Sequence, residues 1–173
     1  MGIGEVDAVA RNEMGTVGST GAALYQEDMS IVIPKMKAIN ERWSTMVAKV
    51  QKALSASTPA YPVAADTITN AMNALKADMR IVSKVLVGGE ATRERSTLVG
   101  LESFDYNTGR YKLQPLPEKA ELVFSQVNDL YFLVDPRRRA DPAKGLASLE
   151  QADALFREWQ SLAQSAEQGP PPQ

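Results

Sequence analysis

The stretch from Ile68 to Leu86 reads ITNAMNALKADMRIVSKVL, and its apolar spacing decides the fold class. Apolar residues recur at steps of three and four, which places them on one face of an α-helix. They are Ile68, Ala71, Leu75, Met79, Val82 and Leu86. Pro62 precedes the stretch, and Gly88-Gly89 follows it, where glycine accepts the left-handed conformation that ends helices. The pattern predicts a helix over residues 62–87.

The preceding segment has the same spacing. Its apolar stripe is Met36, Ile39, Trp43, Met46, Val50 and Leu54. Ser30 is a suitable N-cap, and Pro34 falls in the first turn, where a missing N–H costs little. The segment therefore predicts a helix over about residues 30–56.

Two later segments complete a set of four. The stripe Ala120, Val123, Val127, Leu130 and Val134 predicts a helix over residues 117–134. Asp135-Pro136 ends it, because a residue before proline is pushed out of the helical region. Asp141 is the expected N-cap of a last helix over residues 142–167, with Pro142 at its first position. Asp153 is the one polar residue on that helix's apolar face.

The rest of the chain is expected to be irregular. Glycine-rich residues 1–20 predict a flexible arm, either frayed or ordered by a partner, with a short helix near Ala22–Asp28. Residues 90–116 predict an ordered loop that can contain a short hairpin at the turn signal Asn107–Gly109. Residues 169–173 predict a disordered tail.

Together these segments predict an all-α fold. Residues 21–168 should form an up-down four-helix bundle, with the 90–116 loop between the second and third helices. Short connections join the first helix to the second and the third to the fourth, which favours antiparallel neighbours. Trp43 and Trp159 lie on apolar stripes and are expected in the core, and the methionines are expected to fill gaps there.

Composition excludes several kinds of chemistry. The 173 residues include no histidine and no cysteine, which removes the commonest general base, the commonest zinc ligand and every thiol nucleophile. A net charge of −2 gives no reason to expect nucleic acid as a partner. No apolar run approaches the ~20 residues of a membrane span. We expect a binding protein that is not an enzyme, has no cofactor, is not inserted in a membrane and is a monomer when free.

Two groups of charged residues are the remaining candidates for sites. Glu102 with Asp105, and Asp135 with Asp141, could hold a hard cation such as calcium, although loop solvation and helix capping explain them better. The triplet Arg137–Arg139 lies between the third and fourth helices and could dock on an acidic surface, because arginine is favoured in interfaces. The alternative for the triplet is a solvated turn.

Residues Arg110–Pro117 read RYKLQPLP, which resembles the Arg-aromatic-x-Leu-Gln-Pro-Leu-Pro stretch of the PsbQ family. These proteins are extrinsic oxygen-evolving enhancer subunits of photosystem II, and related four-helix subunits occur in algae and diatoms. In the family the stretch precedes all four helices, whereas here two predicted helices precede it. The resemblance implies a non-enzymatic subunit in the thylakoid lumen of a plastid. It would dock on the lumenal face of photosystem II and help stabilise the oxygen-evolving centre.

The expected contact residues follow from this resemblance and from the arginine triplet. They are Tyr106, Arg110, Tyr111, Gln114, Pro115, Arg137, Arg138 and Arg139. A stretch bracketed by prolines, with exposed aromatics, is a suitable docking strap because its extended backbone is preorganised. The alternative function is the extracytoplasmic ligand-binding or sensory bundle of a bacterial receptor, in the periplasm, with the 90–116 loop covering a small pocket.

Overall fold

The computed structural model describes residues 17–88 and 113–168, with side chains between residues 28 and 166. These residues form four long helices and no strand, which confirms the all-α class. The helices are α1 (Val17–Ser55), α2 (Tyr61–Leu86), α5 (Leu116–Val134) and α6 (Pro142–Gln164), and a 3₁₀ turn, η2 (Ser165–Gln168), follows α6. Most of the predicted arm and loop, the hairpin and the tail lie outside the described residues.

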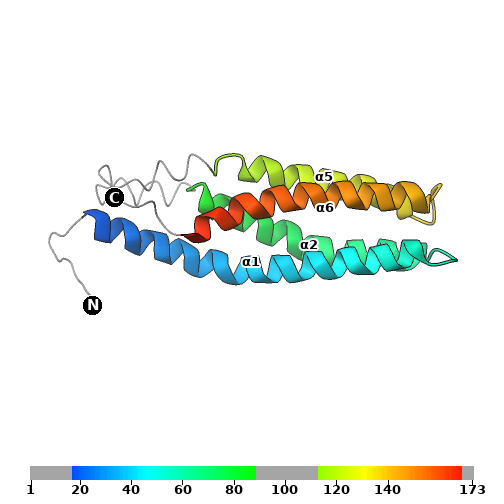
Figure 1. Ribbon diagram of the computed structural model, residues 1–173, viewed down its shortest axis with the longest axis horizontal. Coiled ribbons are helices and arrows are strands. Elements are labelled where there is room, and N and C mark those ends of the chain that lie inside the picture. The colour runs from blue at the N-terminus through cyan, green and yellow to red at the C-terminus, as the bar shows by residue number, and fades with distance from the viewer. Residues whose placement is uncertain (1–16, 89–112, 169–173) are drawn as a thin grey trace.

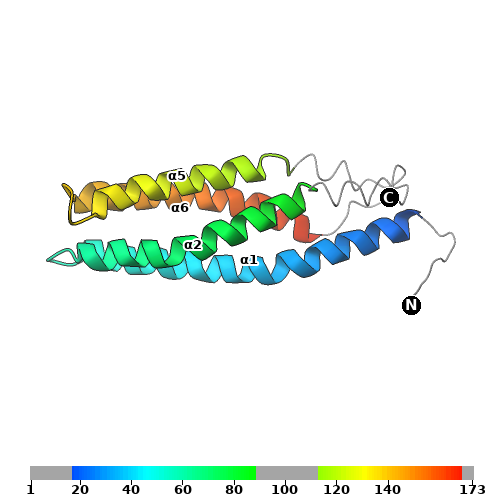
Figure 2. The ribbon, with the colours of Figure 1, turned by 180° about the vertical axis from the view of Figure 1, so that it is seen from behind.

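The four helices pack lengthwise in a rod (Figure 1). Around the rod the order is α1, α2, α5, α6, because α2 contacts α1 and α5, and α6 contacts α5 and α1. The connections at residues 56–60 and 135–141 lie at the same end, which we call the closed end. At the other end, which we call the open end, α2 finishes, α5 begins, and α1 extends beyond both (Figure 2).

The first helix starts earlier than its sequence pattern predicts. α1 begins at Val17, so it absorbs the expected separate helix at 22–28 and the last residues of the expected arm. Ser30 is therefore not an N-cap, and Pro34 lies inside the helix. With 39 residues α1 is roughly 58 Å long, against roughly 28 Å for the 19 residues of α5.

Burial explains why α1 continues through a proline. An interior proline removes one hydrogen bond and costs about 3 kcal/mol. Met29 and Val32 extend the apolar stripe before Pro34 and are only 7% and 0% exposed, and Met36 continues it afterwards at 2%. Burying each such side chain stabilises by about 1.5–3 kcal/mol. The packing on both sides of Pro34 therefore outweighs the lost hydrogen bond.

The other helix ends follow local chemistry. α2 is followed by Gly88, whose φ of 73° is the left-handed conformation expected at this glycine. α6 begins after Asp141, whose carboxylate accepts a hydrogen bond from the Lys144 backbone N–H at 3.0 Å. α5 ends at Val134, and Asp135 before Pro136 is extended, with ψ of 116°. Each of these residues was expected to end or cap its helix.

The core is centred on three aromatic rings. Trp43 of α1 stacks on Phe156 of α6 with ring centroids 4.4 Å apart and an interplanar angle of 8°. Trp159 lies one turn along α6, 6.0 Å from Phe156, and all three side chains are fully buried. Buried apolar residues from all four helices join them in one cluster. Both tryptophans are therefore core residues, as expected.

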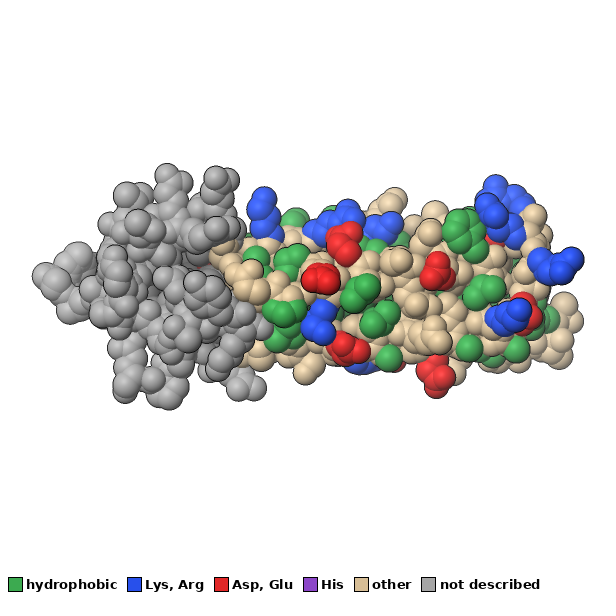
Figure 3. Space-filling view, turned by 90° about the horizontal axis from the view of Figure 1, so that it is seen from above, with side chains coloured by type: hydrophobic (Ala, Val, Ile, Leu, Met, Phe, Trp, Pro, Cys, Tyr) green, Lys and Arg blue, Asp and Glu red, His purple; other side chains and the backbone are tan. Residues whose placement is uncertain are grey.

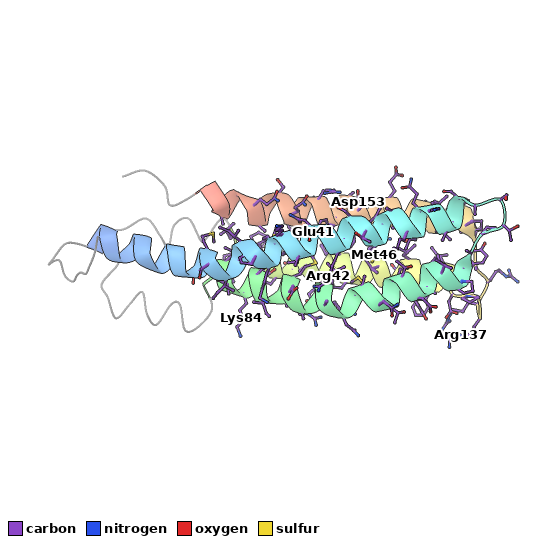
Figure 4. The ribbon with its side chains drawn as sticks, turned by 90° about the horizontal axis from the view of Figure 1, so that it is seen from below. Glu41, Arg42, Met46, Lys84, Arg137 and Asp153 are labelled. Carbon is purple, nitrogen blue, oxygen red and sulfur yellow. The ribbon has the colours of Figure 1, made fainter. Side chains whose placement is uncertain are left out.

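Two hydrogen bonds satisfy the indole N–H groups. Trp43 Nε1 donates to Asp153 Oδ1 at 2.8 Å, which gives a role to the polar interruption on α6 (Figure 4). Trp159 Nε1 donates to Ser83 Oγ at 2.9 Å, and that hydroxyl donates to the Met79 carbonyl at 2.7 Å. A buried donor without a partner would cost about 1–3 kcal/mol. Each buried indole N–H therefore needs an acceptor opposite it, and Asp153 and Ser83 supply these acceptors.

Candidate docking surface

Backbone hydrogen bonds between residues close in sequence stabilise the connection between α5 and α6. The Arg138 N–H donates to the Asp135 carbonyl at 3.0 Å, and the Asp141 N–H donates to the Leu133 carbonyl at 3.0 Å. These bonds close a compact turn over residues 135–141, between the extended Asp135 and the capping Asp141. The arginine triplet is therefore presented by a turn of defined geometry.

Asp135 is the anchor of this turn. Its side chain is only 3% exposed, and Arg137 binds it at two points, with Nε 3.1 Å from Oδ1 and Nη2 3.0 Å from Oδ2. The Arg137 backbone N–H also donates to Oδ1 at 3.0 Å. The side-chain hydrogen bonds, followed by the backbone one, lower the pKa of Asp135, and the same carboxylate raises the pKa of Arg137. The pair stays charged at neutral pH and holds the Arg137 guanidinium in one place (Figure 4).

The other two arginines differ in their contacts. Arg138 lies with its guanidinium carbon 4.5 Å from the centroid of the Phe132 ring and its Nε 3.7 Å from Asp135 Oδ2. Arg139 is exposed, and its side chain has no hydrogen bond or ion pair with the described residues. Phe132 is 42% exposed, so an aromatic ring with an arginine over it reaches the surface here.

Positive charge gathers at the closed end (Figure 3). Residues 49–66 and 132–147, which form this end, contain six Lys and Arg against three Asp and Glu. The remaining residues contain thirteen Lys and Arg against eighteen Asp and Glu. A chain with a net charge of −2 thus has one end with a net charge of +3.

The expected contact residues that the structure describes lie in two separate groups. Tyr106, Arg110 and Tyr111 lie outside the described residues. Gln114 and Pro115 are exposed just before α5, at the open end. The arginine triplet follows α5 at the closed end, so the 19-residue helix separates the two groups by roughly 30 Å.

The last part of the expected strap is not extended. Residues 113–115 form a turn in which the Leu116 N–H donates to the Leu113 carbonyl at 3.0 Å. Leu113 and Leu116 are 7% and 0% exposed, so both side chains enter the core. The gain from burying these two leucines explains why the chain turns here and exposes only Gln114 and Pro115.

Two of the four candidate cation ligands have other roles in the structure. Asp135 is engaged by arginines and Asp141 caps α6, while Glu102 and Asp105 lie outside the described residues. In the described part of the chain no group of three or more carboxylates is placed to hold a metal ion.

Sequence reasoning missed two features of the closed end. It treated Asp135 as a loop acid and did not assign Phe132 to any surface. The Asp-Pro-Arg-Arg order was an available signal, because an aspartate side chain commonly binds the backbone N–H two residues later. The exposure of Phe132 had no such signal, since it depends on how α5 packs.

A shallow groove runs along α5 and α6 toward the open end. It has a volume of about 600 Å³ and is lined by Lys119 of α5 and by Arg157, Glu158 and Leu162 of α6. Lys119 Nζ lies 3.2 Å from Glu158 Oε1, so an ion pair crosses the groove. The groove lies outside the aromatic core.

None of the helices in the described residues is both long and apolar enough to cross a bilayer. Comparisons of the chain with protein-family models, with curated proteins and with solved structures find no match.

Proposed function

We propose that this protein is a non-enzymatic extrinsic subunit that docks by protein contacts on the lumenal face of photosystem II. In this role it helps stabilise the oxygen-evolving centre from the thylakoid lumen, as a monomer when free. The observation that carries the docking role is the exposed arginine turn, in which Asp135 holds Arg137 in a fixed position. The similarity of Arg110–Pro117 to the PsbQ family supplies the choice of partner.

The proposed architecture is an up-down bundle whose segment 90–116 spans the open end. Gln114 and Pro115 would then contact the complex at the open end and the arginine triplet at the closed end. Two contacts roughly 30 Å apart allow one rod to bridge neighbouring surfaces of a large complex. Linked contacts of this kind strengthen binding without any single strong site.

A salt-wash and rebinding assay tests this function. Algal photosystem II membranes are washed with concentrated salt, and the purified protein is added back at low salt. We expect the protein to rebind in a saturable way and to restore part of the lost oxygen evolution. Absence of rebinding together with unchanged oxygen evolution would end the proposal.

The alternative function is an extracytoplasmic ligand-binding or sensory bundle, with the groove between α5 and α6 as its supporting feature. Lys119 and Arg157 could attract a small acid there. Thermal-shift screening against small acids and amines separates the two functions, since a specific ligand raises the melting temperature as its concentration increases. We favour docking because the ion pair between Lys119 and Glu158 already crosses this groove.

A further inference from the structure

We infer that the closed end binds an acidic protein surface end-on, with the Arg137 guanidinium as its fixed contact to a partner carboxylate. The inference rests on the proposed docking role and specifies the chemistry of one contact.

Arg137 is exposed to solvent and at the same time fixed in position by Asp135. Its side chain is 79% exposed although two of its nitrogens are bound to the buried Asp135. A guanidinium carries five N–H donors. Asp135 engages two of them and Tyr131 also takes part in a side-chain hydrogen bond with Arg137, so donors still remain for a second carboxylate. An exposed arginine normally loses side-chain freedom when it binds. Here Asp135 has already removed that freedom, which lowers the cost of binding.

Arg137 has two further arginines and an aromatic ring as its neighbours. Arg138 stacks on the half-exposed ring of Phe132 at 4.5 Å, and Arg139 reaches into solvent. Arginine and aromatic side chains are the residues enriched at interface centres, where they supply most of the binding energy. The patch therefore combines a fixed cation, a stacked cation with its ring, and an exposed cation.

Charge is distributed unevenly along the rod. The closed end has a net charge of +3, whereas the rest of the described residues contain eight Lys and Arg against eleven Asp and Glu, a net charge of −3. An acidic partner surface would attract this end and repel the rest. The closed end would therefore meet that acidic surface first, while Gln114 and Pro115 at the open end would contact a different, neighbouring surface of the complex.

An anionic membrane surface is the competing partner, and the geometry disfavours it. Attraction to an anionic lipid surface increases with the number of basic residues near it, and lysine and arginine contribute alike. An arginine held in one orientation binds more strongly to acceptor atoms that are also held in place. The carboxylates of a folded protein surface are such acceptors. Three of the six cations at the closed end are arginines on one short turn, so the chemistry fits carboxylates of a protein better.

The test compares wild-type protein with three variants on salt-washed algal photosystem II membranes. Arg137→Lys keeps the charge but loses the two-point geometry, and we expect about tenfold weaker binding. Arg139→Glu should weaken binding about tenfold by charge reversal without disturbing Asp135. Lys37→Glu is the matched control, because Lys37 is an exposed α1 cation outside the closed end, and its affinity should stay within about twofold. Each variant must first show wild-type circular dichroism and a cooperative unfolding transition above the assay temperature, because Arg137→Lys also weakens the pair with Asp135 and should lower the melting temperature.

Zero-length carbodiimide cross-linking locates the contact. It joins lysine amines to carboxylates, and we expect Lys52 or Lys144 of the closed end to be linked to acidic residues of a partner protein. If the wild type rebinds while all three variants bind equally well, or the links come only from other lysines, the inference fails and the proposed function survives.

If the wild type does not rebind, the proposed function fails and the closed end is tested alone. The probes are immobilised polyglutamate and vesicles of phosphatidylglycerol in phosphatidylcholine. Retention on polyglutamate that is weakened by Arg137→Lys supports the inference. Equal binding of wild type and Arg137→Lys to the vesicles, or no binding to either probe, overturns it.

Discussion

At the scale of single residues, Ser83 shows how a buried polar group in the core is satisfied by partners on its own helix and on another helix. Ser83 is 1% exposed and serves two bonds, accepting from Trp159 and donating to Met79. The hydroxyl therefore does more than fill space. Replacing it leaves the indole N–H without a partner, which costs more than the loss of an ordinary exposed hydrogen bond.

We expect Ser83→Ala to lower the free energy of unfolding by about 1–3 kcal/mol, because it orphans the Trp159 N–H. In the Trp159→Phe background no N–H is left to orphan, so adding Ser83→Ala should cost clearly less. Urea unfolding of the four proteins measures this coupling. Thr67→Ala is the control, since the Thr67 hydroxyl bonds only to the Val63 carbonyl of its own helix in the described residues. If Ser83→Ala lowered the free energy of unfolding equally in both backgrounds, the lost hydrogen bond to the Trp159 indole would not be the cause of the destabilisation.

The contribution of Asp135 to stability should depend on pH. Its pKa is lowered in the folded protein by Arg137, so its contribution to stability is full above the unfolded value of about 4 and is lost as the pH falls through the folded pKa. Asp135→Asn should therefore be less stable than wild type at pH 7. The difference should shrink as the pH falls below about 4.

Urea unfolding from pH 7 to pH 2 measures this difference. Asp66→Asn, on an exposed residue of α2, controls for the loss of one negative charge at the same end. A constant gap between Asp135→Asn and wild type across this range would contradict the role assigned to the Arg137 pair.

At the scale of helices, one glycine sets how closely α6 approaches its neighbours. A Cβ atom on Gly145 would lie 3.0 Å from Leu54 Cδ1 and 3.3 Å from Val134 Cγ1. Leu54 lies in the last turn of α1 and Val134 is the last residue of α5, so Gly145 allows three helices to meet beside the closed end. The position is buried and has no room for a branched side chain.

A series at this position should separate helix propensity from packing. Gly145→Ala gains about 1 kcal/mol in helix propensity but crowds Leu54, so we expect its stability to stay within about 1 kcal/mol of wild type. Gly145→Val should destabilise by about 2 kcal/mol or more, because its methyl groups have no space. Thermal and urea unfolding provide the measurement. Ala147→Val, on the exposed face of α6, should cost only about 0.5 kcal/mol, and an equal cost at both sites would contradict the packing argument.

At the scale of the whole molecule, the core is one cluster to which all four helices contribute. The two helical pairs share the stacked Trp43 and Phe156 and the bond between Trp159 and Ser83, so neither pair is complete alone. We expect a single cooperative unfolding transition. Tryptophan fluorescence and far-ultraviolet circular dichroism should give the same urea midpoint. Separate midpoints would show that the pairs unfold independently.

The sequence by itself determined the all-α class and the course of the last three helices. Their signals are local, because apolar spacing, Gly88, Asp135-Pro136 and Asp141 act within a few residues of the chain. The start of α1 was not predictable in this way, since Ser30 and Pro34 are local signals for a helix start there, and burial of Met29 and Val32 overrides them.

Only the tertiary structure decided which distant residues meet. Asp153 accepts from Trp43 across 110 positions, and Gln114 lies at the opposite end of the bundle from Arg137 although one helix joins them. Spacing along a chain determines the face of a helix, but not which neighbour covers that face. Candidate docking residues could therefore be proposed from sequence, whereas the separation of the described ones into two ends, and the burial of Asp135 beneath Arg137, required the packed bundle.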